Sequence, residues 1–334
     1  MKKSRIGKMK KAQIQFGWIF AVIVGALILF LAFYFVGAIL FQQREKEETE
    51  YARFLDILMN PFASFGHLIK SAYDKLMLPK ESEVIIECNK EGFENLGYNE
   101  ISVIQKAEKS NGGIQKKVYD KYIFAPQPMK GKEFDALSKP FEMPWRITNI
   151  IILWPSNQEY CFVNAPSKVK NELGNESNIG LNISSIIFSN SINKCPKNSI
   201  KVCFGGNCNG DIKVDTGEKT VENCLGNSCK TVYYSDFGGY SLMYAAIFSD
   251  PILYECNIKR IASRIKLEVY VYQKKALALR QRGCNSVYDL NPLKNAAENL
   301  FKNPSNPRQI TDLEQAARTL KNINEAVYTD CVLF

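Results

Sequence analysis

An uncharged run from Ala12 to Gln43 constrains the fold of this chain more than any other feature of its sequence. Its apolar centre, Phe16 to Phe41, would span roughly 39 Å as an α-helix, which exceeds the ~30 Å hydrocarbon core of a bilayer. The apolar region of a cleaved secretory signal is shorter, so this segment is expected to remain as an anchor. The alternative, a buried core helix, seldom runs this far without a charge. We therefore predict a transmembrane helix over residues 12–43.

The flanking charges predict the orientation of this helix. Six basic residues and no acidic one lie before it: Lys2, Lys3, Arg5, Lys8, Lys10 and Lys11. The other flank, Arg44 to Glu50, is net acidic. The positive-inside rule then predicts a cytoplasmic basic segment over residues 1–11 and a single-pass protein of the cell membrane, with its C-terminal part extracytoplasmic and the lipid bilayer as a partner. Without those six charges the net charge of +9 falls to +3, so charge gives no case for a nucleic-acid partner.

The junction Lys10-Lys11-Ala12-Gln13 resembles the class III, prepilin-type signal of archaeal pilin-like surface proteins. In that family a basic pair and a small residue precede the cut, and a Gln-led hydrophobic helix stays on the mature protein. The resemblance implies processing between Ala12 and Gln13, with the helix serving as anchor or filament core. Gly17 stands where bacterial type IV pilins have glutamate, and an uncleaved signal anchor is the alternative. The exterior is larger than a typical pilin head and resembles archaeal membrane-anchored surface proteins.

Residues 44–80 continue with a helical pattern and are predicted to form juxtamembrane amphipathic helices with a break at Pro61. Apolar residues recur at helical spacing on both sides of the break: Tyr51, Phe54, Leu55 and Leu58, then Phe62, Phe65, Leu68, Ile69, Tyr73 and Leu76. The second stretch would pack on the head or lie on the outer leaflet. His67 is alone there, and we interpret it as structural.

Residues 81–238 are predicted to form a β-rich extracytoplasmic domain with antiparallel sheets. Short β-type runs separated by turn formers indicate strands at residues 84–86, 101–104, 118–124, 147–154, 160–163 and 183–188. The run from Thr148 to Trp154 is apolar on both faces, which predicts a central strand. Asn175 and Asn182 begin acceptor triplets for N-glycosylation.

Residues 239–334 are predicted to form a C-terminal unit of two to three helices, which makes the whole chain α+β. Asp250 and Pro251 would cap and open a long helix that ends before Gly283. A short helix would follow Asn291, and the capping box Thr311-Asp-Leu-Glu314 would start the last one. The long helix is strongly basic, which fits a solvated outer face or an acidic partner.

Ten cysteines follow the anchor, on the side predicted to be oxidising: Cys88, Cys161, Cys195, Cys203, Cys208, Cys224, Cys229, Cys256, Cys284 and Cys331. An even count there predicts disulfides. The repeated units Cys203 to Cys208 and Cys224 to Cys229 resemble hairpin tips. Their four cysteines would pair within each unit or across the two; a zinc site is less suitable, because its usual loop is Cys-x₂-Cys. Cys331 would pair with Cys284 or Cys256, and we favour Cys284 because a short helix intervenes.

The sequence assigns no catalytic residue, metal or cofactor. Asp215-Thr-Gly217 is similar to the aspartic protease loop, but that chemistry needs a second carboxylate and no second copy exists. Ser167 and Lys170 match Ser-x-x-Lys without its companion motifs. The favoured function is therefore a membrane-anchored structural or interaction protein, a component or accessory of a pilus-like assembly. It would contact itself or other surface proteins. The alternatives are an anchored extracytoplasmic hydrolase and a receptor-like ligand binder.

Overall fold

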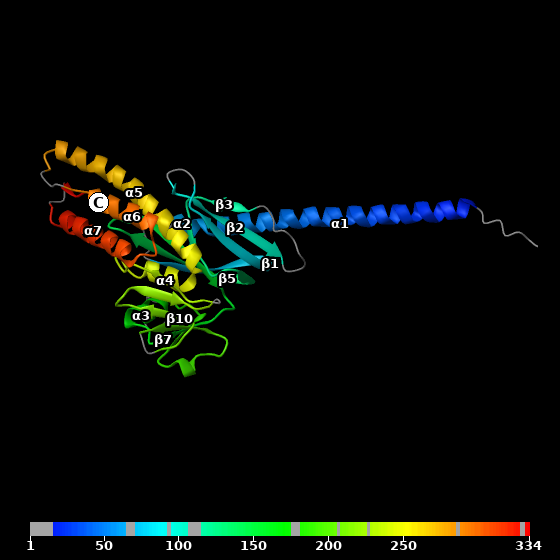
Figure 1. Ribbon diagram of the computed structural model, residues 1–334, viewed down its shortest axis with the longest axis horizontal. Helices are drawn as coiled ribbons and strands as arrows, with labels where there is room; N and C mark the ends of the chain where they lie inside the picture. The colour runs from blue at the N-terminus through cyan, green and yellow to red at the C-terminus, as the bar shows by residue number, and fades with distance from the viewer. Residues whose placement is uncertain are drawn as a thin grey trace, which may run out of the picture.

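In the computed structural model a long helix, α1, extends away from a head that contains every other element (Figure 1). The structure describes residues 16–64, 71–91, 95–105, 115–174, 181–205, 208–225, 228–284, 288–327 and 331–334. The prediction of an α+β chain with an N-terminal apolar helix, β-sheets in the middle and helices at the end is confirmed.

Helix α1 runs without interruption over Phe16–Leu58, and a short helix, α2, follows at Asn60–Ser64. The predicted break falls at Met59, and Pro61 lies in the first turn of α2, where its missing N–H costs no helical hydrogen bond. The prediction of helix up to residue 80 is wrong from Ala72 onward, because Tyr73 and Leu76 belong to a β-strand. Phe65, Leu68, Ile69 and His67 lie outside the described residues.

Sheet A contains six strands in the order β3-β2-β1-β5-β6-β4. Their bounds are β1 Ala72–Asn89, β2 Tyr98–Gln105, β3 Lys116–Val118, β4 Tyr122–Phe124, β5 Met129–Glu142 and β6 Arg146–Pro155. Neighbouring strands are antiparallel except β4 and β6, which are parallel. Strand β6 has partners on both sides and buries both faces, as its apolar sequence predicted.

The two faces of sheet A enter different cores. One face packs against the C-terminal part of α1, with Val84, Ile101 and Ile151 beside Leu55 and Met59. The other face, with Ile150 and Trp154, packs against sheet B and the C-terminal helices in a larger core. Successive side chains of β6 enter the two cores in turn, so this single strand joins them.

Sheet B has the order β12-β11-β10-β9-β7-β8. Its strands are β7 Tyr160–Val163, β8 Ile186–Ser189, β9 Ile200–Phe204, β10 Ile212–Asp215, β11 Thr220–Asn223 and β12 Lys230–Tyr233. The pairs β7/β8, β7/β9 and β9/β10 are parallel. The prediction of an antiparallel middle is therefore wrong for this half of sheet B and correct for β10, β11 and β12.

The remaining helices are α3 Ser167–Leu173, the 3-10 helix η2 Ile192–Lys194, α4 Ser241–Phe248, α5 Pro251–Gln281, α6 Asn291–Lys302 and α7 Pro307–Glu325. Asp250 caps α5 as predicted, since its carboxylate accepts hydrogen bonds from the backbone N–H groups of Ile252 and Leu253. Helix α7, however, begins at Pro307 behind an Asn306 cap. Thr311 lies inside it and donates back to the Pro307 carbonyl, so the predicted capping box is wrong.

Arg260 attaches α5 to sheet A although its residue is 0 % exposed. Its guanidinium donates to Asn99 Oδ1 of β2 and to Asn257 Oδ1, and the other acceptors are main-chain carbonyls: Leu96, Gly97, Tyr119 and Lys121. Burial lowers the pKa of Arg260 from 12.5 to about 10. Neutral dipoles thus satisfy a buried cation at the point where a helix crosses the sheet.

Candidate functional site

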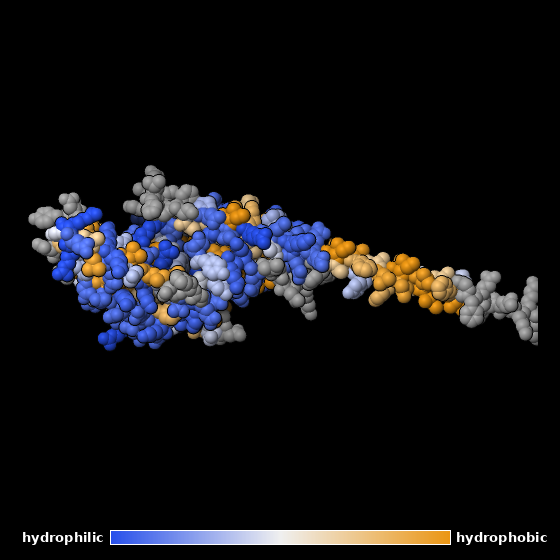
Figure 2. Space-filling view, turned by 90° about the horizontal axis from the view of Figure 1, so that it is seen from above, coloured by the Kyte–Doolittle hydropathy of each residue, from blue (hydrophilic) through white to orange (hydrophobic). Residues whose placement is uncertain are grey.

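The junction between the apolar half of α1 and the head is the most distinctive site of the molecule. Among the described residues, α1 is the one helix long and apolar enough to cross a membrane, and its most apolar 18-residue stretch has a mean hydropathy of 2.9. None of its most apolar stretch is buried in the head. Trp18 is 72 % exposed and Phe33 75 %, whereas Ala52 is 1 % exposed and Leu55 3 %. The same helix is therefore exposed and apolar at one end, as Figure 2 shows, and part of the core at the other.

Polar contacts hold α1 where it enters the head. Glu47 accepts from Lys80 Nζ at 2.7 Å and from Gln105 Nε2 at 3.0 Å. The next residue, Glu48, is 1 % exposed and accepts from the Gln105 backbone N–H at 3.1 Å. These contacts tie α1 to β1 and to the end of β2, directly beyond the apolar run.

One helical turn further on, apolar and ionic contacts fix the rotation of α1 about its axis. Ala52 and Leu55 of α1 are buried against sheet A, as are Met59 and Phe62, which follow the helix. Asp56 forms an ion pair with Lys121, which is 3 % exposed and also donates to the Asp56 carbonyl at 3.1 Å. Because a buried ammonium needs its carboxylate partner, this pair resists any rotation of the helix that would separate the two groups.

The structure pairs all ten cysteines in five disulfides. The pairs are Cys88–Cys256, Cys161–Cys195, Cys203–Cys208, Cys224–Cys229 and Cys284–Cys331. The repeated units pair locally, and Cys331 pairs with Cys284 rather than Cys256. Cys88–Cys256 joins β1 to α5 and therefore braces the same crossing as Arg260.

Only one of the two repeated cysteine units is a hairpin tip. Cys224 and Cys229 close the antiparallel turn between β11 and β12. Cys203 lies in β9 and Cys208 lies in the connection from β9 to β10. These two strands run parallel, so the hairpin prediction is wrong there. Glu222 lies near Cys224 and Cys229 in a cluster of potential metal-ligating atoms. Their sulfurs share a disulfide, which leaves no thiolate for a zinc ion.

The catalytic motifs of the sequence have structural roles. Asp215 is exposed and its Oδ1 accepts from the backbone N–H groups of Gly217 and Glu218, which makes it the first residue of a turn. Ser167 begins α3 without making a side-chain cap. Asn182 is exposed, as a glycosylation acceptor must be, whereas Asn175 and the processing residues Ala12 and Gln13 lie outside the described residues.

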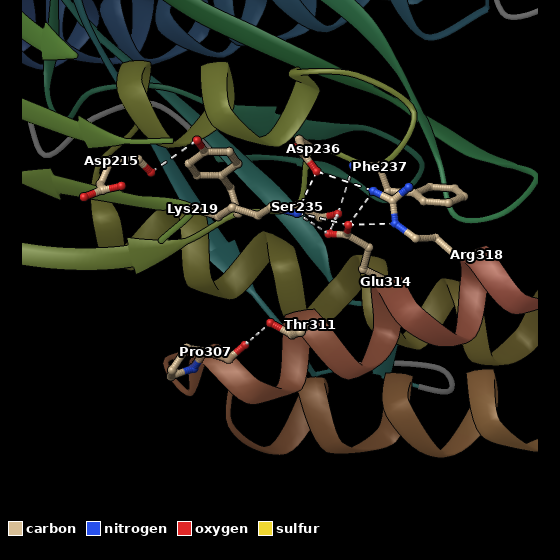
Figure 3. Close-up of polar contacts among 10 residues, drawn as sticks. Asp215, Lys219, Ser235, Asp236, Phe237, Pro307, Thr311, Glu314 and Arg318 are labelled. Carbon is tan, nitrogen blue, oxygen red and sulfur yellow. Dashed lines mark hydrogen bonds and ion pairs between the residues drawn. The ribbon is translucent and has the colours of Figure 1, made fainter. Parts of the chain in front are cut away.

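Sequence reasoning missed a four-membered ionic cluster between sheet B and α7 (Figure 3). Lys219, in the turn after β10, has its Nζ 2.8 Å from Asp236 and 3.0 Å from each Glu314 carboxylate oxygen. Arg318 reaches the Glu314 carboxylate at 2.6 Å, and Ser235 donates to it at 2.9 Å. Only the three-dimensional fold brings these residues together, because 95 positions separate Lys219 from Glu314.

Two members of this cluster, Glu314 and Lys219, have shifted pKa values. Burial acts to raise the pKa of Glu314, but hydrogen bonds from Arg318, Lys219 and Ser235 outweigh it and lower the pKa below its usual value. Burial acts to lower the pKa of Lys219, but Asp236 and Glu314 outweigh it and raise the pKa. Both shifts favour the ionised forms of Glu314 and Lys219, and their contacts fasten α7 to sheet B.

A buried carboxylate on β5 also escaped the sequence analysis. Asp135 is 0 % exposed and accepts hydrogen bonds from Tyr73 and Ser156, each at 2.9 Å, and from Ser185. Ser185 in turn accepts from the indole N–H of Trp154 at 3.0 Å. This chain of hydrogen bonds links sheet A to the segment before β8, which is a structural role.

Open grooves lie at both ends of α5. A groove of about 780 Å³ lies between β1 and the first turns of α5, with Glu87, Lys90, Glu255 and Lys259 on its walls. A second groove of about 460 Å³ lies at the other end of α5, against the start of α6. The first has opposite charges along its walls and no convergent set of acids or bases.

Comparison of the chain with protein-family models, with curated proteins and with solved structures gives no match.

Proposed function

We propose that this chain is a membrane-anchored structural or interaction protein of the cell surface, with its head on the extracytoplasmic side. Helix α1 would anchor it, and the head would present contact surfaces. In a finer form of the proposal, the protein is a component or accessory of a pilus-like assembly, as its N-terminal signal-like junction implies.

The observation that carries the proposal is the continuity of α1 from its exposed apolar half into the core of the head. A tethered enzyme needs only a flexible link between anchor and domain. Here no linker intervenes, and Glu47, Glu48 and Asp56 fix the helix where it enters the head. Such a junction keeps the head in a set position and rotation relative to the anchor, which is useful when copies or partners must meet in register.

The cysteine pairing supports an extracytoplasmic head. Five disulfides are stable in an oxidising compartment and rare in the reducing cytosol. The basic first eleven residues support the same orientation through the positive-inside rule.

Topology is tested first, with the full chain in native membranes. The head should be digested by protease added to the outside of intact cells, and the protein should resist extraction at alkaline pH. Mass spectrometry of the purified N-terminus then separates the two forms of the proposal. A mature chain beginning at Gln13 supports the pilus-like form, and an intact Met1 contradicts it.

Self-assembly is tested by photo-cross-linking. A benzophenone amino acid in place of Phe33, which is 75 % exposed on α1, should give a ladder of adducts between copies if α1 helices pack together. The same substitution at Tyr119, 62 % exposed on the head, is the matched control. Adducts with lipid alone at position 33 would contradict assembly through α1 and leave a single anchor.

A further inference from the structure

The last three turns of α5 carry an exposed surface in which apolar and basic side chains alternate. Tyr270 is 60 % exposed, Val271 63 % and Leu277 55 %, and Lys274 and Arg280 are also exposed. We call these five residues the distal α5 surface. Positions 270, 274 and 277 follow the i, i+4, i+7 spacing that aligns side chains along one helix face. Hydrophobic side chains on a helix face are ordinarily turned inward, so this stripe is unusual for a surface that meets only water.

The positive charge of this surface has no acidic counterpart on its own helix. From Val269 to Gln281 α5 contains no Asp or Glu. Among the described residues, Lys274 and Arg280 take part in none of the ion pairs, and Lys274 instead lies over the Tyr270 ring at 5.3 Å. The neighbouring Lys275 donates to the Leu333 carbonyl at 2.5 Å, which does not neutralise its charge.

A groove of about 460 Å³ opens beside these residues. Its walls include Tyr270, Leu277 and Arg280 from α5, and Tyr288 and Leu290 from the segment before α6. Tyr288 is held in place by its hydroxyl, which donates to the Cys331 carbonyl at 3.0 Å. The Asp289 carboxylate, also in the wall, accepts from the Asn291 backbone N–H. The groove thus combines apolar side chains with the cations Lys274 and Arg280, and Asp289 is the carboxylate in its wall.

This surface lies on the part of the head away from the exposed half of α1 (Figure 1). Figure 2 shows apolar atoms among hydrophilic ones at that end of the head. With α1 as the anchor, the surface would face away from the bilayer, where a partner can approach.

From these observations we infer that the distal α5 surface docks an acidic segment of another protein, with one apolar side chain of that segment in the groove beside Leu277. Lys274 and Arg280, which form no ion pair with the described residues, call for carboxylates, and exposed Tyr270, Val271 and Leu277 call for apolar contact. An anionic glycan or polyphosphate would match the charge but leave the apolar side chains in water. Basic residues near a helix C-terminus also favour the helix dipole, but that effect does not account for the exposed apolar side chains.

The inference rests on the proposed interaction role of the head. The Lys274 amine allows a direct test, because it can be cross-linked to a carboxylate in contact with it. A zero-length carbodiimide reagent joins an amine to a carboxylate only where the two are in contact. Applied to native membranes containing the full chain, it should join Lys274 to an Asp or Glu of another polypeptide, identified by mass spectrometry. Leu277→Ser should lower the yield of this adduct at least threefold, and Arg280→Glu at least tenfold. The double variant Lys132→Glu/Lys197→Glu, at exposed lysines elsewhere on the head, should leave it unchanged.

Three results would overturn the inference: no adduct at Lys274, an adduct only with carboxylates of the same copy, or a yield insensitive to Leu277→Ser. The last result, combined with sensitivity to Arg280→Glu, would show contact through charge alone, without the apolar side chain in the groove. Cross-links at Phe33 do not depend on this surface, so their loss or presence separates failure of the inference from failure of the proposed assembly.

Discussion

Arg260 of α5 donates from its Nη1 to the Oδ1 of Asn99 in β2 at 2.5 Å, and both residues are 0 % exposed. Asn99 Oδ1 also accepts from the Ile123 backbone N–H, so a single amide oxygen joins α5, β2 and β4. The long C-terminal helix is therefore bound to the sheet that receives α1, and the two ends of the chain stabilise each other through that sheet.

Replacing this guanidinium should lower the free energy of unfolding of the head more than a substitution on the exposed side of the same helix. Arg260→Met leaves several buried carbonyls without donors, at a cost of about 3 kcal/mol in the free energy of unfolding. Urea titration of the full chain in detergent measures it. Lys266→Ala, at a half-exposed lysine of α5, should change that free energy by no more than about 0.5 kcal/mol. Equal effects of the two variants would show that Arg260 is not a structural centre.

Stability should depend on acid pH through Glu314. Its folded pKa is lowered, so its contribution is complete above the unfolded value of 4.5 and is lost as pH falls through the folded pKa. Glu314→Gln should therefore destabilise the head by about 1–3 kcal/mol at pH 7, and the difference from wild type should shrink below about pH 4.5. Unfolding curves at stepped pH test this. A difference that stays constant down to pH 3 would assign the loss to packing rather than charge.

The disulfides should contribute unequally, according to the length of chain that each one closes. Cys88 and Cys256 are 168 residues apart, whereas Cys203 and Cys208 are separated by 5. In the chain-entropy model, removing the first bond with two serines costs about 5 kcal/mol and removing the second about 2 kcal/mol. Unfolding without reductant compares them. Native protein should also show no reactive thiol, and several reactive thiols would contradict the pairing.

A charge in the exposed apolar half of α1 should weaken membrane insertion. Leu29→Arg places a guanidinium near the middle of the apolar run, at a cost of about 2.5–3.5 kcal/mol for insertion. The fraction of protein recovered in alkali-washed membranes should fall. Ile57→Arg is the matched control, since Ile57 is 60 % exposed on the same helix but lies in the part of α1 that packs on the head. Unchanged recovery of the Leu29 variant would argue against a transmembrane α1.

The sequence predicted the elements whose local signals agree with their packing. Helix α5 has the Asp250–Pro251 start and a strict apolar spacing, and both its limits were correct. The error at Ala72 arose because Tyr73 and Leu76 fit a helical spacing equally well, while the burial of Leu76 and Leu78 alternates as in a strand. Strand β5 was missed because its lysines and Pro140 mask the buried Phe134 and Leu137. Helix α4 is buried all round and therefore shows no periodicity to detect.

The buried charged residues and their partners could not be predicted in the same way. Asn306–Pro307 carries the same start signal as Asp250–Pro251, and reading it would have placed the first residue of α7 correctly. No local pattern distinguishes buried Arg260 or Lys121 from the exposed basic residues around them. Their partners come from distant strands and turns, so only the packed structure reveals them.

Because α1 is unbroken, the orientation of the head depends on the exact number of residues in the helix. Each residue added to an α-helix turns everything beyond it by about 100° and advances it by about 1.5 Å. One extra residue between Phe41 and Glu47 would leave the anchor and the head individually intact. It would, however, rotate every surface of the head, including the end of α5, about the axis of α1. The helix therefore orients the head as well as anchoring it, and the number of residues in α1 determines that orientation.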